Sequence, residues 1–276
     1  MRVLVYGSEL STATAAAALS SVGHSVRWLP HDETPWSTLV GESWLRREPQ
    51  LVAQIQEAED SGALEIVREL DGGTAFDVVW LALSPSQRDS AAALLQNPRL
   101  TRQPGSVLVN NSTFPVGDTE RLQALMGESG LSVALPDTLE EGRAWASFTR
   151  PTRWLLGCDD PRAEHKLREL LRAFNRRRDA FQVMPQRAAE LTKLAINGML
   201  ATRISYMNEI AGLADTLGVD VEHVRQGMGA DSRIGYEYLY PGCGFGGPSF
   251  SRDLMRLADV QLASGRQSAL LEHVLD

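Results

Sequence analysis

The sequence predicts an α/β protein in which residues 1–185 form a doubly wound, mainly parallel sheet and residues 186–276 form a smaller all-helical dimerisation domain. Short apolar runs rich in β-branched residues recur through the first part, and helical segments separate several of them. Near Pro185 the pattern changes to a long stretch with helical periodicity. No repeat or low-complexity linker joins the two parts, so we expect a hinge between them.

The first elements are predicted as strand, helix and strand. Residues 1–6 form an apolar run that stops at Gly7, and the alanine-rich residues 12–21 are followed by Gly23, a common helix terminator. A second apolar run covers residues 25–29. This order is that of a βαβ unit.

Further strands and helices alternate after this unit. Alternation of this kind predicts helices on both faces of the sheet and a ligand crevice at the carboxyl ends of the strands, which is the plan of a Rossmann-like dinucleotide-binding domain. The predicted strands are 77–83, 106–109, 131–135 and 153–156, and the predicted helices between strands include 49–70 and 86–95.

The second part is predicted to be helical. Residues 188–217 contain no proline, carry apolar side chains at helical spacing and end at Gly218. A shorter helix at 221–228, a Gly/Pro-rich loop at 240–249 and a last helix from Arg252 follow. The apolar face of the long helix exceeds what so small a domain can cover, so we expect a homodimer.

Composition excludes several classes of function. The net charge is −8 and no Lys/Arg cluster stands out, so we expect neither nucleic acid nor a membrane surface as a partner. Cys158 and Cys243 lie far apart, and the histidines never fall at metal-ligand spacing, so we expect no metal. The chain has no leader-like start and no run of about 18 apolar residues, so a cytoplasmic location is expected.

The phosphate-binding loop departs from the usual pattern. A dinucleotide fold places Gly-x-Gly-x-x-Gly after the first strand, whereas this chain has Gly7, Glu9 and Thr12 at the three positions. Glu9 brings bulk and negative charge towards a pyrophosphate. The acid that holds the ribose falls on Pro30, and Asp32 lies two residues beyond. The loop therefore predicts a Rossmann scaffold that has lost ordinary NAD binding; the alternatives are an NAD cofactor in a displaced position or one that gains most of its affinity elsewhere.

Several separated motifs resemble the UDP-glucose/GDP-mannose dehydrogenases. They occur in the family's order and span nearly the whole chain, but only about the first two-thirds of a typical member. The C-terminal nucleotide-binding domain is therefore expected to be absent. The motifs cover residues 48–51, 112–117, 136–142, 189–210, 231–235 and 241–253.

The resemblance implies a chemistry and a set of roles. The family uses NAD to oxidise a sugar C6 alcohol twice, the second time through a cysteine thiohemiacetal. Lys193 and Asn197 are four residues apart and so share one helix face. The resemblance implies that Thr113 positions a water and that Glu141 acts in thioester hydrolysis, while Asp137 stands where the family has another glutamate. It further implies that Lys193 stabilises the alkoxide and that Asn197 binds the substrate. Asp253 is implied to orient the lysine or the water.

Simpler structural interpretations of these residues stay open. Thr113 can belong to a turn, Lys193 can be a solvated helix lysine, and Asp253 can be an acid favoured at a helix N-terminus. Arg233 resembles an arginine that reaches a neighbouring subunit's substrate, but a surface salt bridge is the alternative. Substrate contacts are expected at Arg233, Tyr240 and Gly244.

Ser249 stands where the family has its catalytic cysteine. A thiol with a pKa near 8.5 supplies thiolate near neutrality, whereas a serine hydroxyl does not, and no histidine is evident nearby to activate it. Cys243, six residues upstream, is interpreted as structural rather than as a substitute. The thioester route to the acid should therefore fail.

Three hypotheses remain. The first is a degenerate family member that serves as a binding or regulatory subunit for a nucleotide sugar. The second is an NAD-dependent oxidoreductase that performs a single alcohol–aldehyde step on a nucleotide sugar or small metabolite. The third is another chemistry on the same site, directed at a small metabolite. The altered glycine loop favours the first, and the retained lysine, asparagine and aspartate favour the second.

Overall fold

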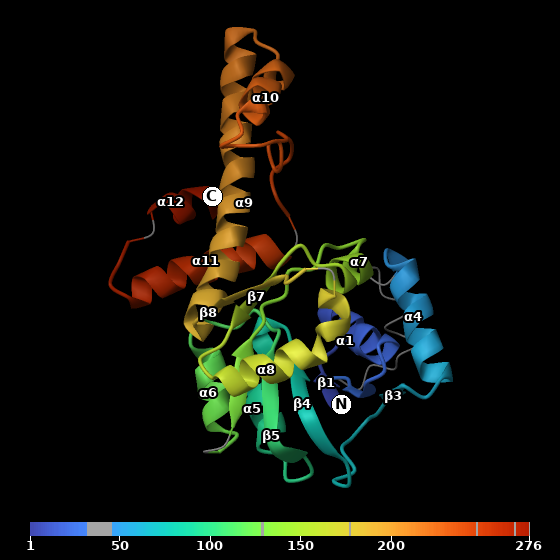
Figure 1. The fold of residues 1–276 in the computed structure, drawn as a ribbon. Coiled ribbons are helices and arrows are strands. Elements are labelled where there is room, and N and C mark those ends of the chain that lie inside the picture. The colour runs from blue at the N-terminus through green and yellow to red at the C-terminus, as the bar shows by residue number, and fades with distance from the viewer. Residues whose placement is uncertain (32–45, 128–129, 177, 247, 268, 276) are drawn as a thin grey trace. The chain divides into compact units, whose positions relative to one another are not determined.

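The computed structural model describes residues 1–31, 46–127, 130–176, 178–246, 248–267 and 269–275. Contacts within the chain divide it into two compact units, Met1–Leu191 and Thr192–Asp276 (Figure 1). None of the described helices is both long enough and apolar enough to cross a bilayer.

The first unit is built on an eight-stranded sheet with the order β3-β2-β1-β4-β5-β6-β7-β8. Neighbouring strands run parallel, except that β6 and β7 meet antiparallel at Ala134 and Gly157. The predicted doubly wound, mainly parallel α/β fold is confirmed. The strands are β1 (Arg2–Tyr6), β2 (Ser25–Leu29), β3 (Leu64–Ile66), β4 (Ala75–Leu81), β5 (Thr101–Asn110), β6 (Leu131–Ala134), β7 (Trp154–Gly157) and β8 (Phe181–Met184).

Helices cover both faces of this sheet. Alternate side chains of one strand point to opposite faces, so Val3 and Val5 enter one apolar cluster and Leu4 enters the other. The first cluster includes residues of α1 (Leu10–Ser21), α4 (Pro49–Asp60), α7 (Ala144–Thr149) and α8 (Pro161–Leu170). The second includes residues of α5 (Arg88–Leu95) and α6 (Asp118–Ala124), and the 3-10 turns Pro85–Gln87 and Arg172–Asn175 complete the unit.

The predicted helix 49–70 is wrong beyond Asp60. Gly62 has a φ of +73°, a backbone conformation that residues other than glycine rarely adopt, and it turns the chain out of α4. Leu64–Ile66 then forms β3, whose Leu64 is paired with Val26 of β2. A strand of three residues is too short to carry a recognisable period of its own.

The regular elements described in the second unit are helices. Helix α9 (Gln186–Leu217) starts within the first unit and continues through the second for 32 residues in all, as the proline-free stretch predicted. The others are α10 (Val221–Ala230), α11 (Pro248–Ala263) and α12 (Ala269–Leu275). Helix α11 begins earlier than the predicted Arg252. A small core joins α9, α11 and α12 through Ala201, Leu254 and Val274.

Candidate functional site

The turn from β1 into α1 is closed tightly against β4. Gly7 has a φ of +142°, and a Cβ added there would lie 2.0 Å from the carbonyl oxygen of Ala82. The hydroxyl of Thr12 donates a hydrogen bond of 2.6 Å to the same carbonyl. Glycine is therefore required at the first position of the loop, and Thr12 fastens the helix to the end of β4.

Glu9 is the N-cap residue of α1. Its backbone N–H donates to the Thr12 hydroxyl at 3.2 Å, and its carboxylate accepts the backbone N–H of Thr12, which completes a capping box. In a dinucleotide-binding domain, free backbone N–H groups at this end of the helix bind the pyrophosphate. Because Glu9 already supplies an anion there, the described residues do not fit the pyrophosphate of NAD at α1.

The end of β2 carries no ribose-binding acid among the described residues, since Pro30 stands at that position and Asp32 lies outside them. Instead, His31 accepts a hydrogen bond from Gln87 at Nδ1 (2.9 Å), and its Nε2 lies 2.8 Å from the hydroxyl of Ser90. His31 and Ser90 line a hollow of about 350 Å³. Sequence reasoning missed His31, because no motif marks it.

A buried polar network joins the carboxyl ends of β4, β5 and β6. Asn110 donates to the hydroxyl of Thr119 (2.9 Å) and accepts from the backbone of Ser112 (3.1 Å). The Ser112 hydroxyl accepts from the backbone of Leu83 (2.9 Å), and Asn111 donates to the carbonyl of Leu135 (2.6 Å). Thr113 follows directly and is half-buried. The network fixes the backbone from which Thr113 projects.

Glu190, in the first turns of α9, ends this network. Its carboxylate accepts from the backbone of Gly117 (2.6 Å) and from the backbone (3.0 Å) and hydroxyl (2.6 Å) of Thr119. Burial raises the pKa of Glu190 above its ordinary value, and these hydrogen bonds oppose that rise only in part.

Asp137 and Glu141 lie on the loop between β6 and α7. Asp137 is half-buried and accepts a hydrogen bond of 2.8 Å from the backbone of Leu139. Glu141 is exposed, and its carboxylate lies 3.9 Å from the guanidinium of Arg47. The loop ends where the buried carboxylate of Glu48 accepts from the backbone of Gly142 and of Ala144.

In the second unit, Asn197 and Asp253 are brought together. The Asn197 side-chain amide donates to the Asp253 carboxylate at 2.6 Å, and both side chains are buried. The Arg252 guanidinium lies 3.2 Å from the other oxygen of Asp253. Lys193, one turn before Asn197 on α9, is half-buried. Asp253 thus orients Asn197 rather than capping α11.

The remaining predicted residues are spread over the loops of this unit. Arg233 forms an exposed ion pair of 2.6 Å with Asp231. Tyr240 is exposed, with the Arg225 guanidinium 4.6 Å from its ring centroid. Gly244 has a φ of +90° in an exposed loop that also carries exposed Cys243. Ser249 lies in the first turn of α11, and its side chain lies outside the described part of the structure.

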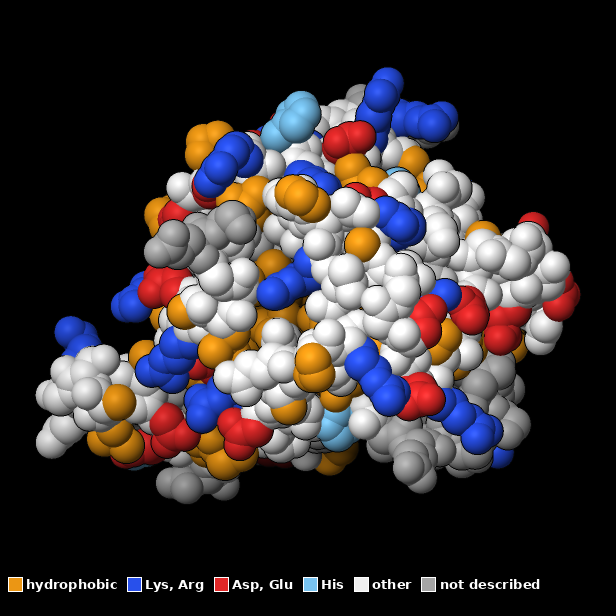
Figure 2. Space-filling model, turned by 90° about the horizontal axis from the view of Figure 1, so that it is seen from below, with side chains coloured by type: hydrophobic (Ala, Val, Ile, Leu, Met, Phe, Trp, Pro, Cys, Tyr) orange, Lys and Arg blue, Asp and Glu red, His pale blue; other side chains and the backbone are white. Residues whose placement is uncertain are grey.

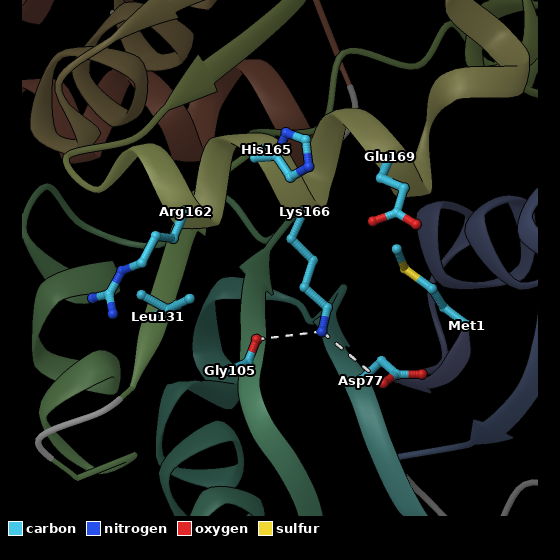
Figure 3. Close-up of a pocket in the computed structure, with 8 residues that line it drawn as sticks. All are labelled: Met1, Asp77, Gly105, Leu131, Arg162, His165, Lys166 and Glu169. Carbon is cyan, nitrogen blue, oxygen red and sulfur yellow. Dashed lines mark hydrogen bonds and ion pairs between the residues drawn. The ribbon is translucent and has the colours of Figure 1, made fainter.

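A larger hollow lies at the opposite edge of the sheet. It has a volume of about 460 Å³ and is lined by α8 and the amino-terminal ends of the strands (Figure 3). Lys166 reaches across it to the carbonyl of Gly105 (3.3 Å) and towards Asp77 (4.0 Å). This hollow contains none of the predicted site residues.

Charges of both signs are interspersed on the face drawn in Figure 2. In the described ranges, no three His, Cys, Asp or Glu side chains are grouped so that they could hold a metal ion.

The family model that matches this chain and the relatives described next are of one kind. The central domain of the UDP-glucose/GDP-mannose dehydrogenase family matches residues 187–276. A UDP-glucose 6-dehydrogenase of Pseudomonas aeruginosa is 35% identical over 99% of this chain and 64% of its own length. The structure of a UDP-glucose dehydrogenase from Pyrobaculum islandicum superposes with a TM-score of 0.82 at 27% identity, covering 99% of this chain and 67% of that one.

A UDP-D-ManNAc dehydrogenase from Pyrococcus horikoshii superposes with a TM-score of 0.83 over all of this chain and 67% of its own. At 19% identity, this likeness shows the fold alone. The chain spans less than two thirds of the Pseudomonas relative, at 64% of its length.

Proposed function

Because the chain belongs to the UDP-glucose/GDP-mannose dehydrogenase family, we propose that it binds a nucleotide sugar and acts as a binding or regulatory subunit. In this role it does not oxidise the sugar to the acid. The observation that carries the proposal is the Glu9 carboxylate at the start of α1. A second anion placed there would meet a like charge and would lose the Thr12 N–H as a donor.

Ser249 supports the same proposal from the sequence. A neutral hydroxyl at the cysteine position cannot form the thiohemiacetal that leads to the acid. The remaining site residues then serve to hold a ligand. We propose ligand-binding roles for Thr113, Asp137 and Glu141 in the first unit and, taken separately, for Lys193, Asn197, Asp253, Arg233, Tyr240 and Gly244 in the second.

A second candidate function is a single alcohol–aldehyde step. The buried Asn197–Asp253 pair favours it, because the Asp253 carboxylate holds the Asn197 amide in one orientation. With one amide hydrogen committed to Asp253, the amide oxygen and the other N–H can contact a substrate oxygen. This step needs no thiol, but it needs a hydride acceptor such as NAD, whose pyrophosphate does not fit the N-terminal end of α1.

We also propose that the chain is a homodimer through α9. Met199, Tyr206 and Leu213 are exposed by 63%, 50% and 54%, and they follow one another at intervals of seven residues. An apolar stripe with this interval is the pattern of a helix–helix seam.

A thermal-shift screen tests the proposed function, because a ligand that binds only the folded state raises its melting temperature. We expect a shift with UDP-glucose or GDP-mannose and none with NADH. Glu9→Gly, which removes the capping carboxylate, should introduce a shift with NADH. If calorimetry gives the unmodified protein a dissociation constant for NADH in the low micromolar range, about −7 to −8 kcal/mol, the second candidate is preferred. No shift with either nucleotide sugar would overturn the proposed ligand.

A further inference from the structure

Two buried glutamates hold loops of the first unit that carry proposed site residues. Glu48 is 3% exposed and Glu190 is 6% exposed. Both lie in family-like motifs, yet neither has a role in the function proposed above. Burying a carboxyl group is costly unless its oxygens receive hydrogen bonds. The groups that supply those hydrogen bonds therefore indicate what each glutamate does.

Glu190 fastens the loop after β5 to α9. One carboxylate oxygen accepts the Gly117 N–H at 2.6 Å, and the other accepts the N–H (3.0 Å) and hydroxyl (2.6 Å) of Thr119. The Thr119 hydroxyl in turn accepts a hydrogen bond from the Asn110 side-chain amide. The amide oxygen of Asn110 accepts the backbone N–H of Ser112. The loop that carries Thr113 is thus held at both of its ends by one connected set of buried side chains.

Glu48 does the same for the loop after β6. It lies at the N-cap of α4, and its carboxylate accepts the Gly142 N–H and, at 3.1 Å, the Ala144 N–H at the start of α7. Asp137 and Glu141 lie on the segment that ends there. Glu48 thereby connects this segment to α4, although Glu48 and Gly142 lie 94 positions apart in the sequence.

We infer that Glu48 and Glu190 are positioning residues, which fix the loops bearing Asp137, Glu141 and Thr113 for ligand binding. The inference rests on the proposed function, in which these loops contact a nucleotide sugar. An amide cannot replace either carboxylate, because a glutamine has one acceptor oxygen and turns an NH₂ group towards a backbone N–H. Each loop therefore depends on both oxygens of its glutamate.

Hydrogen exchange tests whether the loops are held in this way. Glu190→Gln should speed exchange about tenfold at Gly117 and Thr119, and Glu48→Gln should do so at Gly142 and Ala144. Glu120→Gln is the matched control for the first variant, because Glu120 also joins α6 to α9, through an exposed ion pair with Arg187. Glu57→Gln, exposed on α4, is the control for the second. Unchanged exchange at these amides in both glutamine variants would overturn the inference.

UDP-glucose affinity, measured well below the melting temperature, separates positioning from a purely structural role. We expect Glu190→Gln to weaken binding about tenfold, which is about 1.4 kcal/mol. In a double-mutant cycle with Thr113→Ala, the two effects should not add, because Glu190 acts through the loop of Thr113. Additive effects, or a variant that melts earlier but binds equally well, would reduce Glu190 to a structural residue. If the unmodified protein does not bind UDP-glucose, the proposed function fails, while the exchange result still decides whether the loops are held.

Discussion

Glu9 and Thr12 bind each other at the start of α1, which limits what a substitution can do there. The Thr12 hydroxyl accepts from Glu9 and donates to the carbonyl of Ala82, and Thr12 is fully buried. Thr12→Gly would leave that carbonyl without its donor, at a cost of about 1–3 kcal/mol. Glu9 is exposed, and its removal leaves the Thr12–Ala82 bond intact. Of the two, Glu9 is the position at which an anion site can be reopened with little loss of stability.

Ser249→Cys alone should not create a dehydrogenase. A cysteine there would restore a nucleophile able to capture an aldehyde as a thiohemiacetal. Loss of a second hydride to NAD would be needed to convert this thiohemiacetal into the thioester that Glu141 could help to hydrolyse. The first hydride transfer precedes that step and requires a bound cofactor, and under the proposed function Glu9 opposes cofactor binding. We therefore expect no NADH from the variant with NAD and UDP-glucose or GDP-mannose, monitored by absorbance. NADH production would place the defect at position 249 rather than at α1.

Gly7→Ala should destabilise the first unit strongly. The added Cβ would lie 2.0 Å from the Ala82 carbonyl oxygen, at a φ of +142°. We expect a loss of about 2–4 kcal/mol in the free energy of unfolding, measured by urea denaturation. Gly62→Ala is the control, because Gly62 also has a positive φ of +73° but has no atom within 4 Å of the added Cβ. Its cost should be only about 1 kcal/mol, and equal losses would show that backbone conformation alone restricts Gly7.

At the scale of elements, the long periodic helix α9 and the short but fully buried strands β6 and β7 were predictable, whereas β3 and β8 were not. Strands β3 and β8 have three and four residues and are only partly buried, so neither a repeating period nor a continuous apolar run marks them. The same limit applies to the site. Glu48 and Glu190 accept from backbone N–H groups that lie 94 and 73 residues away, and no spacing in the sequence reveals such partners.

The contact between α6 and α9 should give Glu190 a pH-dependent effect on stability. Burial raises the pKa of Glu190 in the folded protein above its unfolded value of 4.5. The contribution of Glu190 to the free energy of unfolding is therefore fully present below the unfolded pKa, and it is lost as the pH rises through the folded pKa. The difference in unfolding free energy between the unmodified protein and Glu190→Gln should decrease over this range. Glu120, whose pKa is lowered chiefly by its hydrogen bond from Arg187, should show the opposite trend when replaced by Gln. A difference that rises with pH for Glu190 would contradict the assignment.

At the scale of the whole molecule, the fold class followed from the order of apolar runs and from the helical pattern after Pro185. The parallel direction of most neighbouring strands is a consequence of that alternation, since βαβ crossovers give parallel strands, whereas the strand order and the antiparallel pair β6–β7 are not. Individual contacts at the crevice were not predictable. His31 meets Gln87 and Ser90 because the segments that follow β2 and β4 leave the same edge of the sheet, and the residue type of His31 alone carries no such information.

The exposed stripe of α9 should hold two copies of the chain together. Met199, Tyr206 and Leu213 are each at least half exposed in one copy. Pairing with the equivalent stripe of a second copy would remove their apolar surface from water. We expect sedimentation to show a dimer at micromolar concentration and a monomer for the double variant Tyr206→Glu and Leu213→Glu, whose charges would face each other across the seam. Asp215→Arg also alters charge on α9, but at an exposed position on the other side of the helix, and it should leave the dimer intact. If the unmodified protein sediments as a monomer, the proposed seam is wrong, and the expected contribution of Arg233 to a neighbouring copy is withdrawn with it.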